Sequence, residues 1–286
     1  MATVDTREAL SASELAAYRR DGFVVPEFRL AGAELALLQA ETMAVVEANP
    51  QLRNRPIPNP NCVSFRRHGI RTDGGLMRFA AQRGIVDIVE RIMGPDIILW
   101  SSTIFNKPPV MGKRTPWHRD GEFWPIEPLA ATSVWIAVTP STITNGCLRV
   151  IPGSHLSTSI GRHYDLQEDD VIFPREIAPD EFDAADAVDV ELEPGQMVFF
   201  DARIIHGANA NDSADLRTGF SARYMPGSSF FNHGAARVRE GDEDGFTLQV
   251  RPLFLLRGQD HANNDFTRNA AEEDRQLLRT VPGIGH

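Results

Sequence analysis

The chain has 286 residues, enough to bury a large hydrophobic core, and mainly β domains of this length often form a single unit. Its 29 Lys and Arg against 39 Asp and Glu give a formal charge of −10, which argues against a nucleic-acid partner because phosphate binding needs a basic surface. No apolar run approaches the ~20 residues of a membrane span, and residues 1–8 lack the pattern of a leader, so we expect a cytoplasmic protein without a membrane partner. The two cysteines, Cys62 and Cys147, form no CxxC pair and are expected to be free thiols.

The N-terminal part, residues 10–93, has the pattern of helices joined by irregular segments. Ser11 followed by Glu14 is typical of a capping box and predicts a short helix up to Tyr18. Residues 49–76 are rich in Pro and Gly and predict a long loop, and loops of that length in compact domains tend to be functional. The other elements expected here are a strand at 23–26 and helices at 32–48 and 86–93.

From about residue 96 to residue 226 the pattern changes to short β-rich runs cut by Gly and Pro turns. A series of short antiparallel strands with such turns predicts a mainly β, double-sheet jelly roll. We expect one domain in which the helical part precedes this core and a C-terminal extension, 227–286, adds loops and a helix near 269–278. The expected strands are 96–105, 134–138, 147–151, 188–192, 197–200 and 219–225.

A candidate metal site begins with His118 and Asp120, because alternate side chains of a β-strand point the same way. His206, in a second β-rich segment, offers a third ligand. Two His and one carboxylate on one face of an iron leave three positions open, as in non-haem Fe(II) oxygenases. Arg217 then supplies a cation suited to gripping a carboxylate with two hydrogen bonds. A second His-x-Asp triplet at 163–165 lies in a polar, acid-rich stretch and is predicted to be a surface loop.

Several motifs in this order and spacing resemble the phytanoyl-CoA dioxygenase family of Fe(II)/2-oxoglutarate-dependent oxygenases. The resemblance runs from Leu10 to about Pro226, and it implies a double-stranded β-helix (a jelly roll) with flanking N-terminal helices and the iron at one open end. The matching segments are Tyr18-Arg19-Arg20-Asp21-Gly22-Phe23, Asn106-Lys107-Pro108-Pro109, Trp117-His118-Arg119-Asp120, Asn145-Gly146-Cys147-Leu148, Pro152-Gly153-Ser154-His155 and Pro194-Gly195-Gln196 through His206-Gly207 to Tyr224-Met225-Pro226.

The resemblance also implies a role for individual residues. His118, Asp120 and His206 would hold Fe(II), and Arg217 would pair with the distal carboxylate of the cosubstrate 2-oxoglutarate, which reacts together with O₂. Ala208 stands where the family often has a hydroxyl donor to the cosubstrate, so Arg217 would carry more of the anchoring. The residues expected beside the cosubstrate are Trp135, Thr103 and Asn106.

The resemblance extends to the type of reaction. Related halogenating enzymes leave the position of Asp120 to a small residue so that chloride can bind the metal, and an Asp here fills that position. Hydroxylation of an unactivated C–H bond is therefore expected rather than halogenation. His155, in the Pro-Gly-Ser-His turn, is expected to be a structural neighbour of the site rather than a ligand.

Substrate contacts are expected around the metal motif and in the long loop. Five arginines of the loop precede its first acid, which favours a clamp for an anion, although a solvated basic loop is the simpler interpretation. Residues 156–187 are expected to form a lid. The substrate would be a small anionic or zwitterionic metabolite, an aminoalkylphosphonate being one candidate. The candidate substrate residues are Phe123, Trp124, Arg66, Arg67 and Arg223.

Two alternative functions stay open. An oxygenase on the same scaffold that desaturates, cyclises or epimerises a secondary metabolite needs the same iron. A non-catalytic jelly-roll binding protein could retain the ligand set by descent, although a pure binder has no chemical need for Arg217. The sequence does not indicate the oligomeric state.

Overall fold

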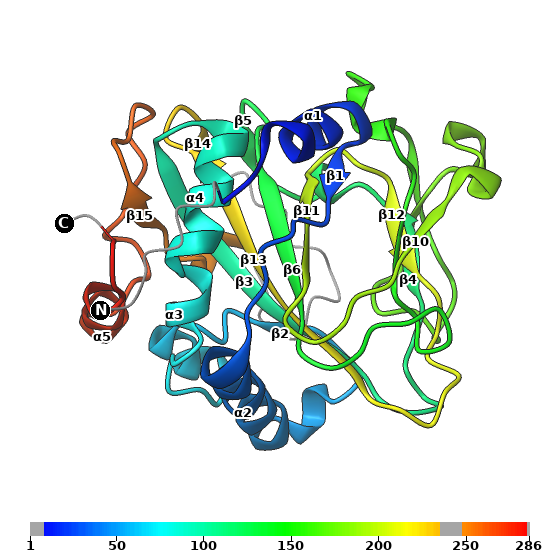
Figure 1. Ribbon diagram of the computed structural model, residues 1–286, viewed down its shortest axis with the longest axis horizontal. Helices are drawn as coiled ribbons and strands as arrows, with labels where there is room; N and C mark the ends of the chain where they lie inside the picture. Colours follow the sequence, from blue (N-terminus) through cyan, green and yellow to red (C-terminus); the bar gives the residue numbers. More distant parts are fainter. Residues whose placement is uncertain (1–8, 235–247, 285–286) are drawn as a thin grey trace.

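The computed structural model describes residues 9–234 and 248–284, and two antiparallel sheets face each other in it (Figure 1). The large sheet has the order β1-β11-β6-β13-β3-β15, with β2 also paired to β3, and the small sheet has the order β10-β7-β12-β4. The predicted double-stranded β-helix is confirmed. The strands of the large sheet are β1 (Phe23–Val24), β2 (Ile57–Pro58), β3 (Ile97–Lys107), β6 (Thr132–Ala137), β11 (Met197–Asp201), β13 (Arg217–Pro226) and β15 (Phe254–Arg257), and those of the small sheet are β4 (Thr115–His118), β7 (Leu148–Val150), β10 (Val188–Val190) and β12 (His206–Ala208).

Helices cover one side of the large sheet, while the small sheet lies on the other side (Figure 1). The helices predicted near the N-terminus and at 86–93 are confirmed, as is the C-terminal helix near 269–278. Among the described helices, none combines the length and the hydropathy needed to cross a bilayer. The helices are α1 (Ala12–Asp21), α2 (Gly32–Ala48), α3 (Met77–Ala80), α4 (Arg83–Met93) and α5 (Glu272–Arg279), and the short 3-10 helices are η1 (Pro50–Leu52), η2 (Val63–His68), η3 (Asp120–Glu122), η4 (Ser154–Leu156), η5 (Pro179–Glu181), η6 (Ala184–Asp186) and η7 (Leu248–Val250).

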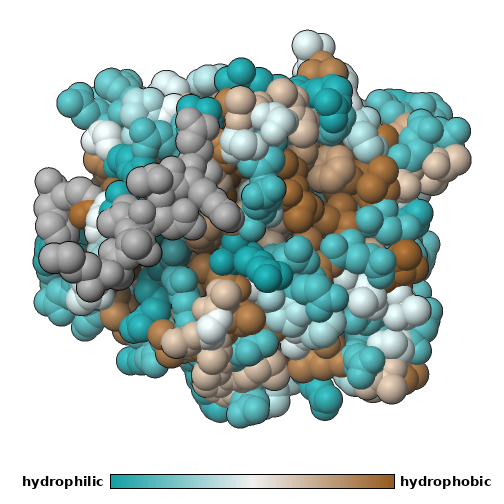
Figure 2. All heavy atoms as spheres, viewed as in Figure 1, coloured by the Kyte–Doolittle hydropathy of each residue, from teal (hydrophilic) through white to brown (hydrophobic). Residues whose placement is uncertain are grey.

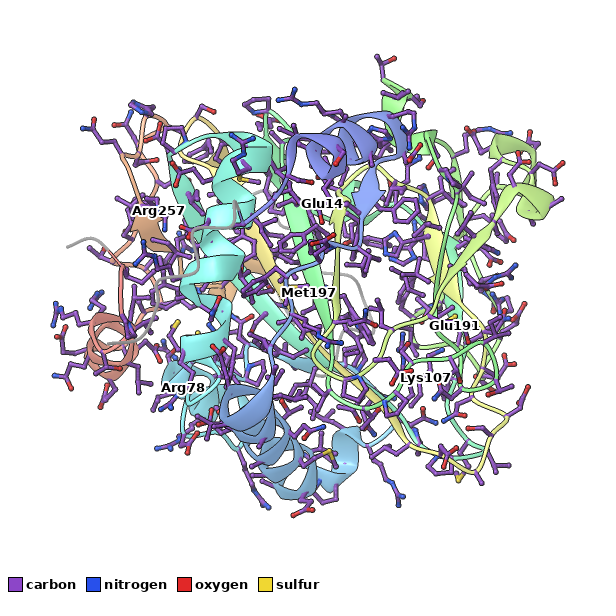
Figure 3. All side chains as sticks on the ribbon, viewed as in Figure 1. Glu14, Arg78, Lys107, Glu191, Met197 and Arg257 are labelled. Carbon is purple, nitrogen blue, oxygen red and sulfur yellow. The ribbon has the colours of Figure 1, made fainter. Side chains whose placement is uncertain are left out.

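Strand β6 shows how alternation divides the interior into two cores. Val134 and Ile136 face outward and pack with the helices, whereas Trp135 and Ala137 face the space between the two sheets. Met197 belongs to the helix-side core and lies near the centre of Figure 3. Hydrophilic residues predominate on the face drawn in Figure 2, and its hydrophobic residues gather towards the centre and right. The inner core stops at one end of the sheets, where polar side chains replace it.

Two expectations about local structure were wrong. The triplet at 163–165 is not a loop: it forms β8 (His163–Asp165), which pairs with β9 (Arg175–Ile177) in a separate two-stranded sheet. The C-terminal extension holds β15 and β14 (Phe230–Phe231), which pairs with β5 (Ile126–Glu127), so it contributes strands as well as loops. Its part at 235–247 lies outside the described residues. Both cysteines are free and buried, as predicted.

The predicted capping box at the start of α1 is present, and it leads to a stability prediction. The Ser11 side chain accepts from the Glu14 N–H, and the Glu14 carboxylate accepts from the Ser11 N–H at 2.7 Å. Ser11→Ala leaves helix N–H groups without a protein partner and is expected to lower the free energy of unfolding by about 1 kcal/mol. Urea denaturation measures this, with Ser13→Ala as the matched control because its hydroxyl accepts from no backbone N–H among the described hydrogen bonds. Equal losses in the two variants would contradict the capping role.

Candidate metal centre and cosubstrate pocket

The three candidate metal ligands come from neighbouring strands of the small sheet. His118 is the last residue of β4, and Asp120 begins η3 immediately after it. His206 is the first residue of β12, which pairs with β4 so that His206 and His118 are direct partners across the ladder. Strand pairing therefore brings together two segments that are far apart in the sequence, and the turn after β4 adds the carboxylate.

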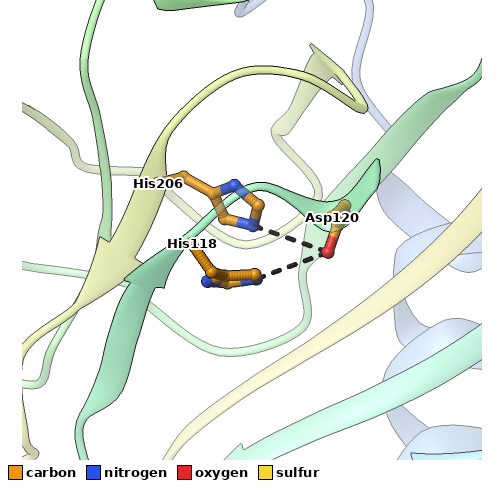
Figure 4. Close-up of side chains that lie close together, drawn as sticks. All are labelled: His118, Asp120 and His206. Carbon is orange, nitrogen blue, oxygen red and sulfur yellow. Dashed lines mark ion pairs between the residues drawn. The ribbon is translucent and has the colours of Figure 1, made fainter. Parts of the chain in front are cut away.

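The three side chains converge on one point (Figure 4). The Nε2 atoms of His118 and His206 lie 3.4 Å and 3.9 Å from the same Oδ1 of Asp120. One ligand atom from each residue lies within 4.8 Å of the others, and each residue is 8% exposed or less. The group has the composition of the two-histidine, one-carboxylate site that binds Fe(II) with open positions.

Backbone carbonyls fix the orientation of both imidazoles. Nδ1 of His118 lies 2.8 Å from the carbonyl oxygen of Pro116, and Nδ1 of His206 lies 3.1 Å from that of Ile204. A carbonyl oxygen can only accept, so each Nδ1 carries the proton and donates it. The Nε2 lone pairs are then free to face Asp120 and a metal ion, which is the usual arrangement around metal-binding histidines.

The protonation states suit a cation as well. Burial alone would raise the pKa of Asp120, but the neighbouring His118, His206 and Arg223 outweigh it and lower that pKa to about 2. Burial and the neighbouring His118 lower the pKa of His206 to about 4. At neutral pH the site therefore offers an ionised carboxylate beside a neutral imidazole, and both are forms that bind metal.

A cavity of about 710 Å³ opens onto these ligands and reaches Arg217. Its walls combine aromatic and aliphatic side chains with a smaller number of polar groups, which is typical of small-molecule sites. Ala208 lines it as well, with a methyl group that offers no hydrogen bond. The Phe and Trp residues on its wall are Trp100, Phe105, Phe123, Trp124, Trp135, Phe173 and Phe200.

Arg217 is a buried cation without an acidic partner among the described residues. It is 3% exposed, its guanidinium lies 4.4 Å from the centre of the Trp135 ring, and its Nε has no hydrogen-bond partner. Within residues 9–234 and 248–284, no carboxylate lies at ion-pair distance from it. Burial lowers its pKa only to about 10, so it stays charged at neutral pH. An unpaired buried charge is costly, so the cavity is suited to an anion at this end.

Lys107 is the strand partner of Arg217 but does not line the cavity. Figure 3 labels it near the end of β3, and its Nζ donates to the carbonyl oxygen of Lys113 at 2.8 Å. Burial and the charge of Arg217 lower its pKa to about 6. Lys107 is therefore largely neutral at pH 7, and Arg217 is the charged member of the pair.

Comparison with known proteins agrees with this geometry. The family model for phytanoyl-CoA dioxygenase (PhyH) matches residues 18–219, about seven tenths of the chain.

The chain belongs to the phytanoyl-CoA dioxygenase family.

Individual relatives match this chain over different lengths and with different sequence identities. A probable phytanoyl-CoA dioxygenase of Caenorhabditis elegans is 31% identical over 159 residues, and the match spans 53% of this chain and 51% of that protein. The ectoine dioxygenase of Bordetella bronchiseptica is 28% identical over 281 residues, spanning 87% of this chain and 88% of that protein. The apo structure of the non-heme monooxygenase ThoJ is 23% identical, covers 94% of this chain and 95% of its own, and superposes with a TM-score of 0.66. ThoJ therefore shares the fold.

Most of the candidate site residues in this PhyH family member line the cavity, although three do not. Trp135, Thr103, Phe123, Trp124 and Arg223 lie on its wall together with the candidate ligands and Arg217. The side chains of Asn106, Arg66 and Arg67 are not on this wall.

The three remaining candidates are held by other parts of the chain. Asn106 donates to the carbonyl oxygen of Arg53 at 2.7 Å and accepts from the Thr218 hydroxyl at 2.6 Å, so it joins the loop to the sheet. Arg66 and Arg67 donate to backbone carbonyls near η2, Arg67 to Ser64 at 3.1 Å. Neither arginine is on the cavity wall, so the structure does not support the proposed clamp from this loop.

Phe173 and Arg251 are among the residues of the cavity wall that were not predicted individually. Phe173 lies in the segment expected as a lid, with its ring centre 4.8 Å from that of His118. Arg251 lies in the weakly patterned C-terminal extension, where no local sequence signal distinguishes it. The hairpin that carries Phe173 is attached to the ligand loop, because Arg175 of β9 binds Glu122 at 2.6 Å. His163 of β8 accepts from the Arg119 N–H at 3.4 Å.

Gly219 keeps the ring beneath Arg217 in place. A Cβ atom at this position would lie 1.9 Å from Cζ2 of Trp135. Gly219→Ala is therefore expected to displace Trp135, to destabilise the fold by about 1–3 kcal/mol and to weaken 2-oxoglutarate binding. Urea denaturation and calorimetric titration with 2-oxoglutarate measure the two effects. The control is Gly234→Ala, where a Cβ has only an ordinary contact at 3.4 Å; similar losses in both variants would contradict the close packing at Gly219.

Proposed function

We propose that the chain is an Fe(II)/2-oxoglutarate-dependent dioxygenase that hydroxylates an unactivated C–H bond of a small anionic or zwitterionic metabolite. One observation carries the proposal: a two-histidine, one-carboxylate group and the buried Arg217, which has no acidic partner among the described residues, share a single cavity. The first feature fits Fe(II), and the second fits the distal carboxylate of 2-oxoglutarate. A protein that only bound ligands would need neither in combination.

The chain's own residues position the reactants and keep water out. His118, Asp120 and His206 would hold the metal, and backbone carbonyls fix the orientation of both imidazole rings. Arg217, stacked on Trp135, binds one end of the cosubstrate and so sets its direction in the cavity. Bound iron supplies the oxidation, in which O₂ delivers one oxygen atom to the substrate and one to 2-oxoglutarate, which leaves as succinate and CO₂. The aromatic wall limits the access of water to this reaction.

Substrate-stimulated succinate formation tests the proposal. Protein loaded with Fe(II) under anaerobic conditions is given 2-oxoglutarate and O₂ with a panel of aminoalkylphosphonates, small carboxylates, ectoine and phytanoyl-CoA. The expected result is more succinate with one class of compound than without it. Absence of both Fe(II) binding and 2-oxoglutarate binding would contradict the proposal and favour the non-catalytic binding protein.

A second candidate function, on the same metal site, differs only in the fate of the substrate. The completeness of the ligand set supports both functions equally, because desaturation, cyclisation and epimerisation need the same iron. Mass spectrometry of the product separates them: hydroxylation adds one oxygen atom, desaturation or cyclisation removes two hydrogens, and epimerisation leaves the mass unchanged.

A further inference from the structure

Arg223 places a second cation in the cavity, on the same face of β13 as Arg217 and six residues beyond it. Six residues of a strand span about 20 Å, so the two arginines serve different parts of the cavity. Arg223 donates to the Thr103 hydroxyl at 2.8 Å, and its guanidinium lies 5.7 Å from the ring centres of Phe105 and Trp124. Its Nε is buried and has no hydrogen-bond partner, and within the described residues no carboxylate lies at ion-pair distance from it.

Arg251 brings a third cation to the same part of the cavity. Ser101 is the strand partner of Arg223, and the Ser101 hydroxyl accepts from Nη1 of Arg251 at 2.9 Å. Asn59 also accepts from this Nη1, so the guanidinium is fixed in direction. Arg251 is 8% exposed and lies on the cavity wall, as does Arg223. Two oriented guanidinium groups thus meet at the β3 side of the cavity.

The charges of the proposed reactants leave Arg223 without a counterion among the described residues. On the proposed function, Fe(II) brings two positive charges and Asp120 cancels one of them. The remaining iron charge and Arg217 balance the two negative charges of 2-oxoglutarate. Among the described residues, Glu122 is the other acid on the cavity wall, and it is already bound to Arg175 at 2.6 Å. A substrate without negative charge would therefore leave Arg223 buried with no anion, which is costly.

We infer that the substrate carries an oxyanion head, a carboxylate or a phosphonate, that Arg223 and Arg251 bind together. Guanidinium groups bind such heads through paired hydrogen bonds. The wall next to the pair is apolar: the Trp100 and Trp124 rings lie edge to face at 4.7 Å, and Leu248 continues the surface. The rest of the substrate is correspondingly apolar. This inference rests on the proposed function and adds to it the head group and the residues that bind it.

Calorimetric titration with matched probes tests the inference. Anaerobic protein loaded with Fe(II) and 2-oxoglutarate is titrated with hexylphosphonate, hexanoate, hexanol and hexylamine, which share an alkyl chain and differ in charge. We expect the phosphonate and the carboxylate to bind at least about 30-fold more tightly than the alcohol and the amine. Arg223→Met is expected to weaken both anions by about 30-fold or more and to leave hexanol unchanged, and Arg223→Lys is expected to recover part of the loss. The stronger of the two anions identifies the head group.

The matched control is Arg66→Met, which removes an arginine that lies outside the cavity. It is expected to change none of the four affinities. If Arg223→Met does not fold, Arg251→Met and the charge preference of the unaltered protein carry the test.

Two outcomes overturn the inference. One is equal affinity for hexanol and hexanoate in the unaltered protein. The other is a loss of 2-oxoglutarate affinity in Arg223→Met with both hexyl anions unaffected, which would assign Arg223 to the cosubstrate. The same titrations on metal-free protein separate the two proposals, because anion preference there with no binding of Fe(II) or 2-oxoglutarate would leave the oxyanion site standing and remove the proposed function.

Discussion

His206→Ala is expected to lower Fe(II) affinity by more than about 100-fold and to reduce substrate-dependent succinate formation to background. His206 offers one of three ligand atoms that lie within 4.8 Å of one another, and alanine cannot replace its lone pair. The ring is also held by the Ile204 carbonyl, which fixes the direction of its Nε2. Anaerobic titration with Fe(II) measures the loss directly, and succinate formation measures its consequence.

A matched histidine separates metal binding from packing. The ring of His155 contacts the Arg19 carbonyl at 3.2 Å and lies against Gly22, and it does not line the cavity. His155→Ala should therefore bind Fe(II) as tightly as the unaltered protein, although it loses packing on α1. Unchanged Fe(II) affinity in His206→Ala, or an equal loss in both variants, would remove His206 from the metal site.

The sequence alone identifies the His118-x-Asp120 part of the metal site because these two ligands are close together in the chain. His118 and Asp120 are two residues apart beside a strand, and both face the cavity. The pairing of β4 with β12 depends on contacts between distant segments. The sequence offered His206 as a third ligand by its residue type and by the resemblance to a family, but it did not predict this pairing. The triplet at 163–165 shows the converse. Its polar composition suggested a loop, yet the segment is a strand because β9 pairs with it.

Strand connections show a second limit of local patterns. The Asn145-Gly146 turn lies between β6 and β7, and Gly146 has the positive φ that such a turn needs. The two strands nevertheless belong to different sheets. Turn residues determine where the chain reverses, whereas the packing of the two sheets determines which strands pair. For the same reason, the local sequence did not predict that Arg66 and Arg67 lie outside the cavity. It also did not predict that Arg251 lines it.

Arg217→Met is expected to raise the 2-oxoglutarate concentration for half-maximal activity by about 100-fold or more, with Fe(II) affinity retained. The methionine keeps much of the contact with Trp135 but removes the buried charge and its paired hydrogen-bond donors. The 2-oxoglutarate requirement of Arg217→Lys should lie between those of the unaltered protein and Arg217→Met, because an ammonium group keeps the charge but loses the planar pair of hydrogen-bond donors. Calorimetric titration with 2-oxoglutarate gives the affinity, and succinate formation gives the kinetic requirement.

Arg149 provides the matched control for this variant. Its guanidinium also lies over a tryptophan, 5.4 Å from the Trp117 ring centre, but it is paired with Asp189 at 2.9 Å and does not line the cavity. Arg149→Met should leave 2-oxoglutarate affinity unchanged. An unaltered 2-oxoglutarate requirement in Arg217→Met would remove Arg217 from the cosubstrate site.

The pH dependence of 2-oxoglutarate binding decides whether Arg217 acts alone or with Lys107. The pKa of Arg217 is lowered by burial to about 10, so its charge persists from pH 6.5 to pH 9. The pKa of Lys107 is lowered by burial and by Arg217 to about 6, so Lys107 is charged below that pH and loses its charge as the pH rises through it. If Arg217 alone holds the carboxylate, affinity stays constant from pH 6.5 to pH 9. An affinity that falls steadily with rising pH across the lower part of this range, and does so less in Lys107→Met, would mean that the bound carboxylate draws a proton onto Lys107 and that both side chains form the anion site.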